Sequence, residues 1–240
     1  HGQLRVRRGT SGGHAPVIVM DDVDVARVAE LTAAAKFRNA GQLCLCPTRF
    51  YVHDAVHDRF VAELGERARA LRVGNGLDPE VQMGPLANPR RVAAMRAFCE
   101  DATRRGARIV CGAEAPKGQD DGFFWSPTVL ADIPDDAAAM TQEPFGPLAL
   151  VTRFDDLDAV LTRANSLDFG LASYAFTNSL RAAHAIEHGL EAGSVSINTF
   201  AVSPPEMPFS GIKSSGLGSE MGREGLLDHM NVKAVIRAVA

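Results

Sequence analysis

The feature that most constrains the fold of this chain is a regular alternation of short apolar runs with segments of helical periodicity. The apolar runs have the length of buried or half-buried strands, and they occupy residues 16–20, 49–53, 107–111, 123–130, 148–154, 172–176 and 194–198. Between them, apolar residues recur at helical spacing, as from Ala55 to Leu71 and from Pro89 to Ala102. Strands that alternate with helices of about 10–15 residues predict an α/β fold with a largely parallel sheet.

Residues with strong positional preferences mark the expected ends of these segments. Asp21 or Asp22 can cap the first helix, and Ser179 can cap the last one. Gly106 fits the position just after a helix. Residues 1–13 are different: they are rich in arginine, hold no acidic residue and show no periodicity. We therefore expect a basic leader outside the domain, which begins at about residue 14.

Composition excludes several classes of protein. The chain has 240 residues, 46% hydrophobic and 22% charged, with a formal net charge of −4, so it is neither a disordered chain nor a basic partner of nucleic acid or membrane. No apolar run approaches the roughly 20 residues of a membrane span, and the first residues lack the apolar stretch of a signal peptide. Four cysteines are too few for a disulfide scaffold of this size. We expect a cytoplasmic location.

The sharpest local feature is the segment Asn-Ala-Gly-Gln-Leu-Cys-Leu-Cys-Pro-Thr-Arg at residues 39–49. Cys44 follows a glycine-containing helix exit and precedes a strand, a place where a thiol can be exposed as a nucleophile if its pKa is lowered or a base lies nearby. The alternative is a buried cysteine that acts as a small hydrophobe. Cys46 adds a redox or metal interpretation. No second Cys or His pair accompanies it at ligand spacing, so we predict no metal site.

Two other segments hold residues suited to a site. Glu143-Pro-Phe-Gly-Pro147 places a carboxylate and an aromatic ring just before an apolar run, although a capping Glu and a core Phe would explain the same residues. The glycine-rich stretch 208–218 needs open backbone space. It could hold phosphate, but it matches neither the P-loop nor the dinucleotide-binding glycine pattern.

The order and spacing of these segments are more specific than any one of them. Together they resemble the catalytic half of the NAD(P)-dependent aldehyde dehydrogenase superfamily, over nearly the whole chain from Gly12. The resemblance implies an aldehyde dehydrogenase catalytic domain at residues 14–230, a largely parallel α/β domain, without the family's N-terminal dinucleotide-binding domain. It also implies that residues 231–240 form a strand used in subunit assembly, so we expect a homo-oligomer.

The resemblance also implies roles for particular residues. Cys44 matches the nucleophile that forms a thiohemiacetal with a small-molecule aldehyde and then, after hydride transfer to NAD or NADP, a thioester. Glu143 matches the carboxylate that holds the nicotinamide ribose, and Phe145 matches the aromatic residue near the nicotinamide ring. Asn198 and the loop that begins at Phe209 resemble the segment that closes the substrate pocket.

Finer details resemble the succinate-semialdehyde dehydrogenase branch. Arg38 lies six residues before Cys44, where that branch has an arginine that pairs with the far carboxylate of the substrate. Ser203 lies where the branch has a second carboxylate contact, and Cys46 matches a cysteine that can form a disulfide with the nucleophile. The alternative for Arg38 is a solvated cation at a helix end.

One position departs from the family pattern in a way that affects the chemistry. Thr10 stands where the family has the glutamate that serves as general base, and threonine cannot perform that proton transfer. We therefore expect the chain alone to have little or no dehydrogenase activity. Two other functions stay open: a non-catalytic fragment or assembly partner of full-length subunits, and a thiol redox protein that uses Cys44 and Cys46.

Overall fold

The computed structural model describes residues 9–10, 12–118 and 121–238. Its centre is a seven-stranded sheet with the order β4-β5-β6-β3-β2-β8-β9. The strands of this sheet are β2 Ala15–Val19, β3 Pro47–His53, β4 Arg108–Cys111, β5 Thr128–Ala131, β6 Leu148–Phe154, β8 Ala172–Phe176 and β9 Ser194–Ile197. All neighbours pair in parallel except β4, which runs antiparallel to β5 at the edge. The predicted α/β class and largely parallel sheet are confirmed.

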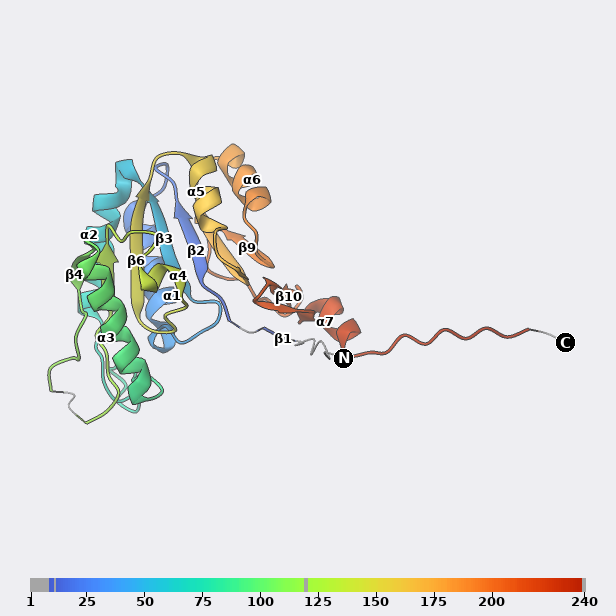
Figure 1. Cartoon of the computed structure of the whole chain (residues 1–240), viewed down its shortest axis with the longest axis horizontal. Helices are drawn as coiled ribbons and strands as arrows, with labels where there is room; N and C mark the ends of the chain where they lie inside the picture. The colour runs from blue at the N-terminus through green and yellow to red at the C-terminus, as the bar shows by residue number, and fades with distance from the viewer. Residues whose placement is uncertain (1–8, 11, 119–120, 239–240) are drawn as a thin grey trace.

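Helices cover both faces of this sheet (Figure 1). The helices beside the sheet are α1 Val25–Phe37, α2 Asp54–Ala70, α3 Pro89–Arg104, α4 Ala138–Thr141, α5 Leu157–Ala164 and α6 Leu180–Gly189. A further helix, α7 Gly222–Asp228, lies apart from the sheet and contacts β13 Ser219–Glu220. α1 and α2 pack against each other on one face, and α5 and α6 lie on the other. The connection from β2 to β3 and the connection from β8 to β9 run in opposite directions across the sheet. Because both crossovers are right-handed, their helices lie on opposite faces. The core fills both interfaces, with Phe50, Leu130 and Tyr174 fully buried.

The first helix begins later than the sequence predicts. Its N-cap is Asp24, whose side chain accepts hydrogen bonds from the amides of Ala26 and Arg27. Asp22 instead contacts the segment after β8, where its carboxylate accepts from Thr177 Oγ1 and from the amide of Asn178, each at 2.9 Å. Asp22 therefore ties the carboxyl end of β2 to that of β8 and is not available as a cap.

Short two-stranded ribbons form outside the main sheet, in segments where the sequence predicts no strand. They pair β1 Gly9–Thr10 with β12 Gly216–Leu217, β10 Phe209–Ser210 with β13 Ser219–Glu220, and β7 Phe169–Gly170 with β11 Ile212–Lys213. The predicted leader thus joins the fold by backbone pairing at residues 9–10, while residues 1–8 and 11 lie outside the described part. Residues 231–238 have no regular secondary structure and extend away from the domain (Figure 1).

The sheet order places three connecting segments side by side. β6, β3 and β2 are adjacent parallel strands, so the segments that lead into them meet at the amino edge of the sheet. These segments carry Gly12 and Gly13, Cys44, and the loop from Glu143 to Pro147. Ligands of open α/β sheets usually bind at the carboxyl edge. The candidate site here is at the opposite edge.

Candidate active site

A tight left-handed turn carries Cys44 from α1 to β3. The 3-10 helix Arg38–Gly41 has positive φ at Asn39, Ala40 and Gly41, with values of 50°, 52° and 69°. A side chain at Gly41 would overlap the carbonyl group of Gly146, so the glycine lets this turn contact the 143–147 loop through backbone alone. The turn therefore fixes the position of the thiol relative to that loop.

Neighbouring backbone and side chains hold Cys44 in place. A Cβ on Gly13 would lie 2.6 Å from the carbonyl oxygen of Cys44, so only glycine allows this approach. The hydroxyl of Tyr174 donates to the carbonyl oxygen of Leu45 at 2.6 Å. The Cys44 side chain is half-buried, whereas Cys46, Cys99 and Cys111 are buried. Cys44 is thus the accessible thiol among the four.

Glu143 faces the glycine pair that precedes β2. Its Oε1 accepts a hydrogen bond of 3.0 Å from the amide of Gly13, and a Cβ on Gly12 would come within 3.0 Å of Oε2. Burial raises the pKa of Glu143, while the Gly13 amide and the positive charges of Arg91 and Lys36 lower it. Arg91 also donates to the carbonyl oxygen of Pro144, which holds the loop against α3.

The electrostatic surroundings of Cys44 do not favour a thiolate. Burial raises the pKa of Cys44 above its usual 9.0, and the carboxylates of Glu143 and Glu220 raise it further. The backbone N–H groups of Cys44 and Leu45 act in the opposite direction, but the net shift is upward. A thiol in this state is protonated at neutral pH, and it needs a base to act as a nucleophile.

A buried amine lies next to the second cysteine. Lys36 is fully buried, and its Nζ donates to Cys46 Sγ at 3.4 Å. Burial lowers the pKa of Lys36, whereas Cys46 and Glu143 raise it; burial also raises the pKa of Cys46. Cys46 is therefore engaged with Lys36, and its pairing with Cys44 in a disulfide stays a prediction.

Arg38 and Phe145 both have exposed side chains close in sequence to these contacts. Among the residues that the structure describes, none forms a hydrogen bond or an ion pair with the Arg38 side chain. Phe145 is 37% exposed and has a φ of 44°. An unpaired guanidinium group and an accessible ring can both take part in binding.

The remaining predicted residues lie elsewhere along the chain. Asn198 follows the carboxyl end of β9, the opposite edge of the sheet from Cys44, and its side-chain amide pairs with both backbone groups of Thr177 at 2.8 and 2.9 Å. Ser203 is half-buried in the next loop. Phe209 is buried in the β10–β13 ribbon, where it pairs with Glu220. The negative charge of Glu220 contributes to the raised pKa of Cys44. The structure therefore links the ribbon, but not Asn198, to the thiol.

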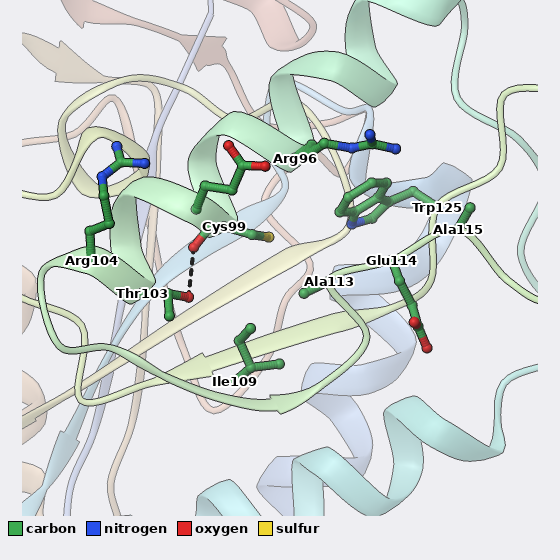
Figure 2. A pocket seen from close by; sticks show the side chains of 10 residues that line it. Arg96, Cys99, Thr103, Arg104, Ile109, Ala113, Glu114, Ala115 and Trp125 are labelled. Carbon is green, nitrogen blue, oxygen red and sulfur yellow. Dashed lines mark hydrogen bonds between the residues drawn. The ribbon is translucent and has the colours of Figure 1, made fainter.

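A cavity of about 620 Å³ lies away from this cluster, between α3 and the turn after β4 (Figure 2). Cys99, Trp125 and Ile109 contribute to its wall, and none of the predicted site residues does. Burial raises the pKa of Cys99 to about 12, so that thiol is unreactive at neutral pH. The cavity and the candidate active site are separate features.

Lys36, Arg91 and Tyr174 are parts of the site that the sequence did not reveal. Lys36 lies four residues after Thr32, on the buried face of α1. Because lysine is rarely buried without a partner, a lysine on the apolar face of a predicted helix is the signal that marks it. Arg91 and Tyr174 come from segments far from Cys44 in sequence, so no local pattern marks them.

Comparisons with known proteins identify relatives of this chain. Residues 10–235 match the aldehyde dehydrogenase family. The 4-(hydroxymethyl)benzenesulfonate dehydrogenase of Comamonas testosteroni is 48% identical over 92% of this chain and 46% of its own length. The NADP-dependent succinate-semialdehyde dehydrogenase of Escherichia coli is 43% identical, again over 92% and 46%. The crystal structure of an E. coli NADP-dependent enzyme superposes with a TM-score of 0.90 at 43% identity, covering 93% of this chain and 46% of that one.

The fold and the site thus define an α/β domain with an accessible cysteine at the amino edge of its sheet. The chain belongs to the aldehyde dehydrogenase family. It spans about half the length of the curated relatives that it matches. Within the described residues, no helix is long and apolar enough to cross a membrane.

Proposed function

We propose that this chain is the nucleophile-bearing domain of an NAD(P)-dependent enzyme that oxidises an aldehyde with a distant anionic group to the carboxylic acid. The observation that carries the proposal is the placement of Cys44, an accessible thiol held between the Gly12–Gly13 turn and the loop of Glu143. The family membership supports the reaction class.

The residues present fit one end of a nicotinamide cofactor. The half-buried carboxylate of Glu143 keeps Oε2 available to accept from ribose hydroxyl groups, and the exposed ring of Phe145 can pack against a planar ring. When bound, the cofactor would accept a hydride from the substrate. We assign no residue of this chain to the pyrophosphate or the adenine, so tight binding needs further protein surface.

Cys44 takes part in two steps of the proposed reaction: it attacks the aldehyde as the nucleophile, and it is later the leaving group of the thioester. The sulfur forms a bond to the aldehyde carbon, and the backbone N–H of Cys44 can donate to the developing oxyanion. Loss of hydride from that carbon leaves a thioester. Water then attacks the thioester, the carbon–sulfur bond breaks, and the acid leaves as the thiol reforms. A base must take the proton of Cys44 and that of the water, and Thr10 cannot serve as that base.

Arg38 supports an anionic substrate. Its guanidinium group is exposed and without a partner among the described residues, and such a group forms bidentate pairs with carboxylates. Two relatives at 43–48% identity are named for a sulfonate and for a semialdehyde, both compatible with a cationic contact. These names differ from each other, so identity alone does not fix the substrate, and a semialdehyde such as succinate semialdehyde is our proposal.

Protection of Cys44 from alkylation tests the role of Arg38 without requiring turnover. Succinate semialdehyde and butanal both add reversibly to a thiol, but only the first has a carboxylate. We expect succinate semialdehyde to protect Cys44 at about 10-fold lower concentration than butanal, because a charge-assisted pair contributes about 1.5–3 kcal/mol. The variant Arg38→Gln should lose that difference. Arg27→Gln, at an exposed arginine on the preceding helix α1, should keep it. Equal protection by both aldehydes in the unaltered chain would refute an anion site.

Acyl transfer tests the nucleophile itself. An activated ester such as p-nitrophenyl acetate should acetylate Cys44 at alkaline pH, and mass spectrometry of the digested chain would locate the acetyl group. Cys44→Ser should abolish this modification, whereas Cys99→Ser should leave it unchanged, because Cys99 is 4% exposed. Acetylation at other cysteines with Cys44 unmodified would overturn the assignment.

Activity of the isolated chain separates this proposal from the alternative of a non-catalytic assembly partner. We expect reduction of NAD or NADP with succinate semialdehyde to be slower by at least about 10²–10⁴-fold than for an intact relative, because the missing general base alone contributes that much and tight cofactor binding needs further protein surface. Co-purification with a full-length family member without acylation of Cys44 would instead favour the assembly role.

A further inference from the structure

The exposed face of α6 gathers two histidines and a glutamate. His184, Glu187 and His188 occupy positions i, i+3 and i+4, which lie on one side of an α-helix. Their side chains are 72%, 47% and 67% exposed. On the other side of the helix, Ile186 is fully buried against the sheet, so this face is held toward solvent.

The three side chains converge. Nδ1 of His184 lies 3.0 Å from Glu187 Oε1, and Nδ1 of His188 lies 3.5 Å from the same oxygen. The two imidazole rings have their centroids 4.2 Å apart. One potential ligand atom from each residue lies within 4.8 Å of the others. Ligand atoms around a single ion with bonds of about 2.0–2.2 Å are separated by about 3–3.5 Å, so binding requires these exposed side chains to rotate toward one point.

The donor set selects a class of metal. Imidazole nitrogens with one carboxylate suit Zn²⁺, Ni²⁺ and Cu²⁺, whereas Mg²⁺ and Ca²⁺ prefer oxygen ligands alone. The spacing His-x-x-Glu-His is one by which a helix presents two histidines to zinc. Nδ1 of His188 lies 2.8 Å from the carbonyl oxygen of His184, and a proton donated there leaves Nε2 as a ligand nitrogen.

The sequence led us to predict no metal site, but the convergence of these side chains departs from that prediction: we propose that His184, Glu187 and His188 form a surface site for one divalent transition-metal ion of the Zn²⁺ and Ni²⁺ class. The site lies on α6, outside the cluster around Cys44, and does not depend on the proposed dehydrogenase function. Because all three ligands come from one exposed helix turn, water completes the coordination sphere, and the site binds metal without a dry cavity for catalysis.

Paramagnetic broadening by Ni²⁺ gives a residue-specific test. Substoichiometric NiCl₂ added to the ¹⁵N-labelled chain should broaden the amide signals of α6 around residues 184–188 before those of other segments. His184→Gln and His188→Gln should each remove this local effect. His229→Gln, at an exposed histidine next to another helix, should leave it intact. Both altered positions in α6 are exposed, so their substitution should not disturb folding, and circular dichroism would verify this.

Calorimetry with NiCl₂ and ZnCl₂ gives the strength of the site. We expect each single histidine variant to weaken the tightest binding event at least 10-fold relative to the unaltered chain and to His229→Gln. Broadening centred on another segment, or equal affinity in the unaltered chain and His188→Gln, would overturn the proposal. Binding that persists in both histidine variants would assign the metal to other groups, such as the thiols, and would also overturn it.

Discussion

At the residue scale, Cys44 combines access with an unfavourable protonation state. The turn at Arg38–Gly41 leaves the thiol half-exposed, while burial and two carboxylates raise its pKa. From the sequence we predicted that Cys44 can be exposed. We also predicted that it lacks the family's general base, because Thr10 stands at the position of that glutamate. Burial is the main cause of the upward pKa shift, and Glu143 and Glu220 add to it, so the shift exists only in the folded chain.

This state of Cys44 predicts its alkylation behaviour. With iodoacetamide, the rate at Cys44 should rise about 10-fold per pH unit from about pH 7 to about pH 9 without reaching a plateau, because only the thiolate reacts. Quantitative mass spectrometry of each cysteine measures this. Cys99 should stay unmodified until the chain unfolds, since it is buried with a pKa of about 12. A plateau at neutral pH would show a stabilised thiolate and contradict the prediction.

His14 predicts how stability depends on pH. Burial, together with the positive charge of Arg49, holds the pKa of His14 well below 6.5, and its ring lies 2.7 Å from Thr48 Oγ1 and 3.0 Å from the carbonyl oxygen of Ala139. Below pH 6.5 the unfolded chain binds a proton that the folded chain excludes. This histidine therefore stabilises the fold above that pH and should lower the free energy of unfolding by about 1.4 kcal/mol per pH unit below it.

Urea unfolding between about pH 7 and about pH 5 tests the contribution of His14. The slope of stability against pH should be smaller in His14→Gln, whatever the change in absolute stability, because glutamine does not titrate. His229→Gln is the control at an exposed histidine and should keep the original slope. Equal slopes in the unaltered chain and His14→Gln would refute the prediction.

At the element scale, the site depends on contacts between connecting segments. The sequence correctly predicted most helices and strands, including α3 from Pro89 and α6 between Ser179 and Gly189. It did not predict α4, α7 or the two-residue ribbons. Ribbon pairs such as Gly9–Thr10 with Gly216–Leu217 depend on partners about 200 residues apart. Periodicity over so few residues carries no signal.

The close contact of Gly41 with Gly146 predicts that a methyl group added at Gly41 lowers the stability of the chain. Gly41→Ala would overlap the Gly146 carbonyl at a φ of 69° and should destabilise the chain by about 1–3 kcal/mol. Gly84→Ala is the matched control, since an added Cβ there meets no atom within 4 Å. Urea unfolding measures both. A change of similar size in the two variants would show that the turn and the loop do not depend on this approach.

At the scale of the whole molecule, the C-terminal segment is the part that lacks a partner within the described chain. Val232, Val235 and Ile236 are 101%, 71% and 98% exposed, and residues 231–238 pair with no strand. Exposed apolar residues grouped in this way favour association. We therefore predict that the segment pairs as a strand with a second subunit, and homo-oligomerisation remains a proposal.

Analytical ultracentrifugation tests this association. The unaltered chain should sediment as an oligomer at micromolar concentration, and the double variant Val235→Asp with Ile236→Asp should shift toward the monomer, because buried charges oppose assembly. A double variant at Leu77 and Leu180, two exposed leucines outside the segment, is the control and should sediment like the unaltered chain. A monomeric unaltered chain would contradict the prediction.

The sequence by itself determined the α/β class and the family, and it indicated Cys44 as the candidate nucleophile and Thr10 in place of the family's glutamate, because these depend on local periodicity and on motif order along the chain. The tertiary structure alone decided which residues meet at the amino edge of the sheet. Glu143 with Gly13 and Gly41 with Gly146 are brought together by the order of β6, β3 and β2, whereas Lys36 meets Cys46 through the local turn between α1 and β3. That order arises from burial of apolar residues over the whole chain, so no short segment encodes it.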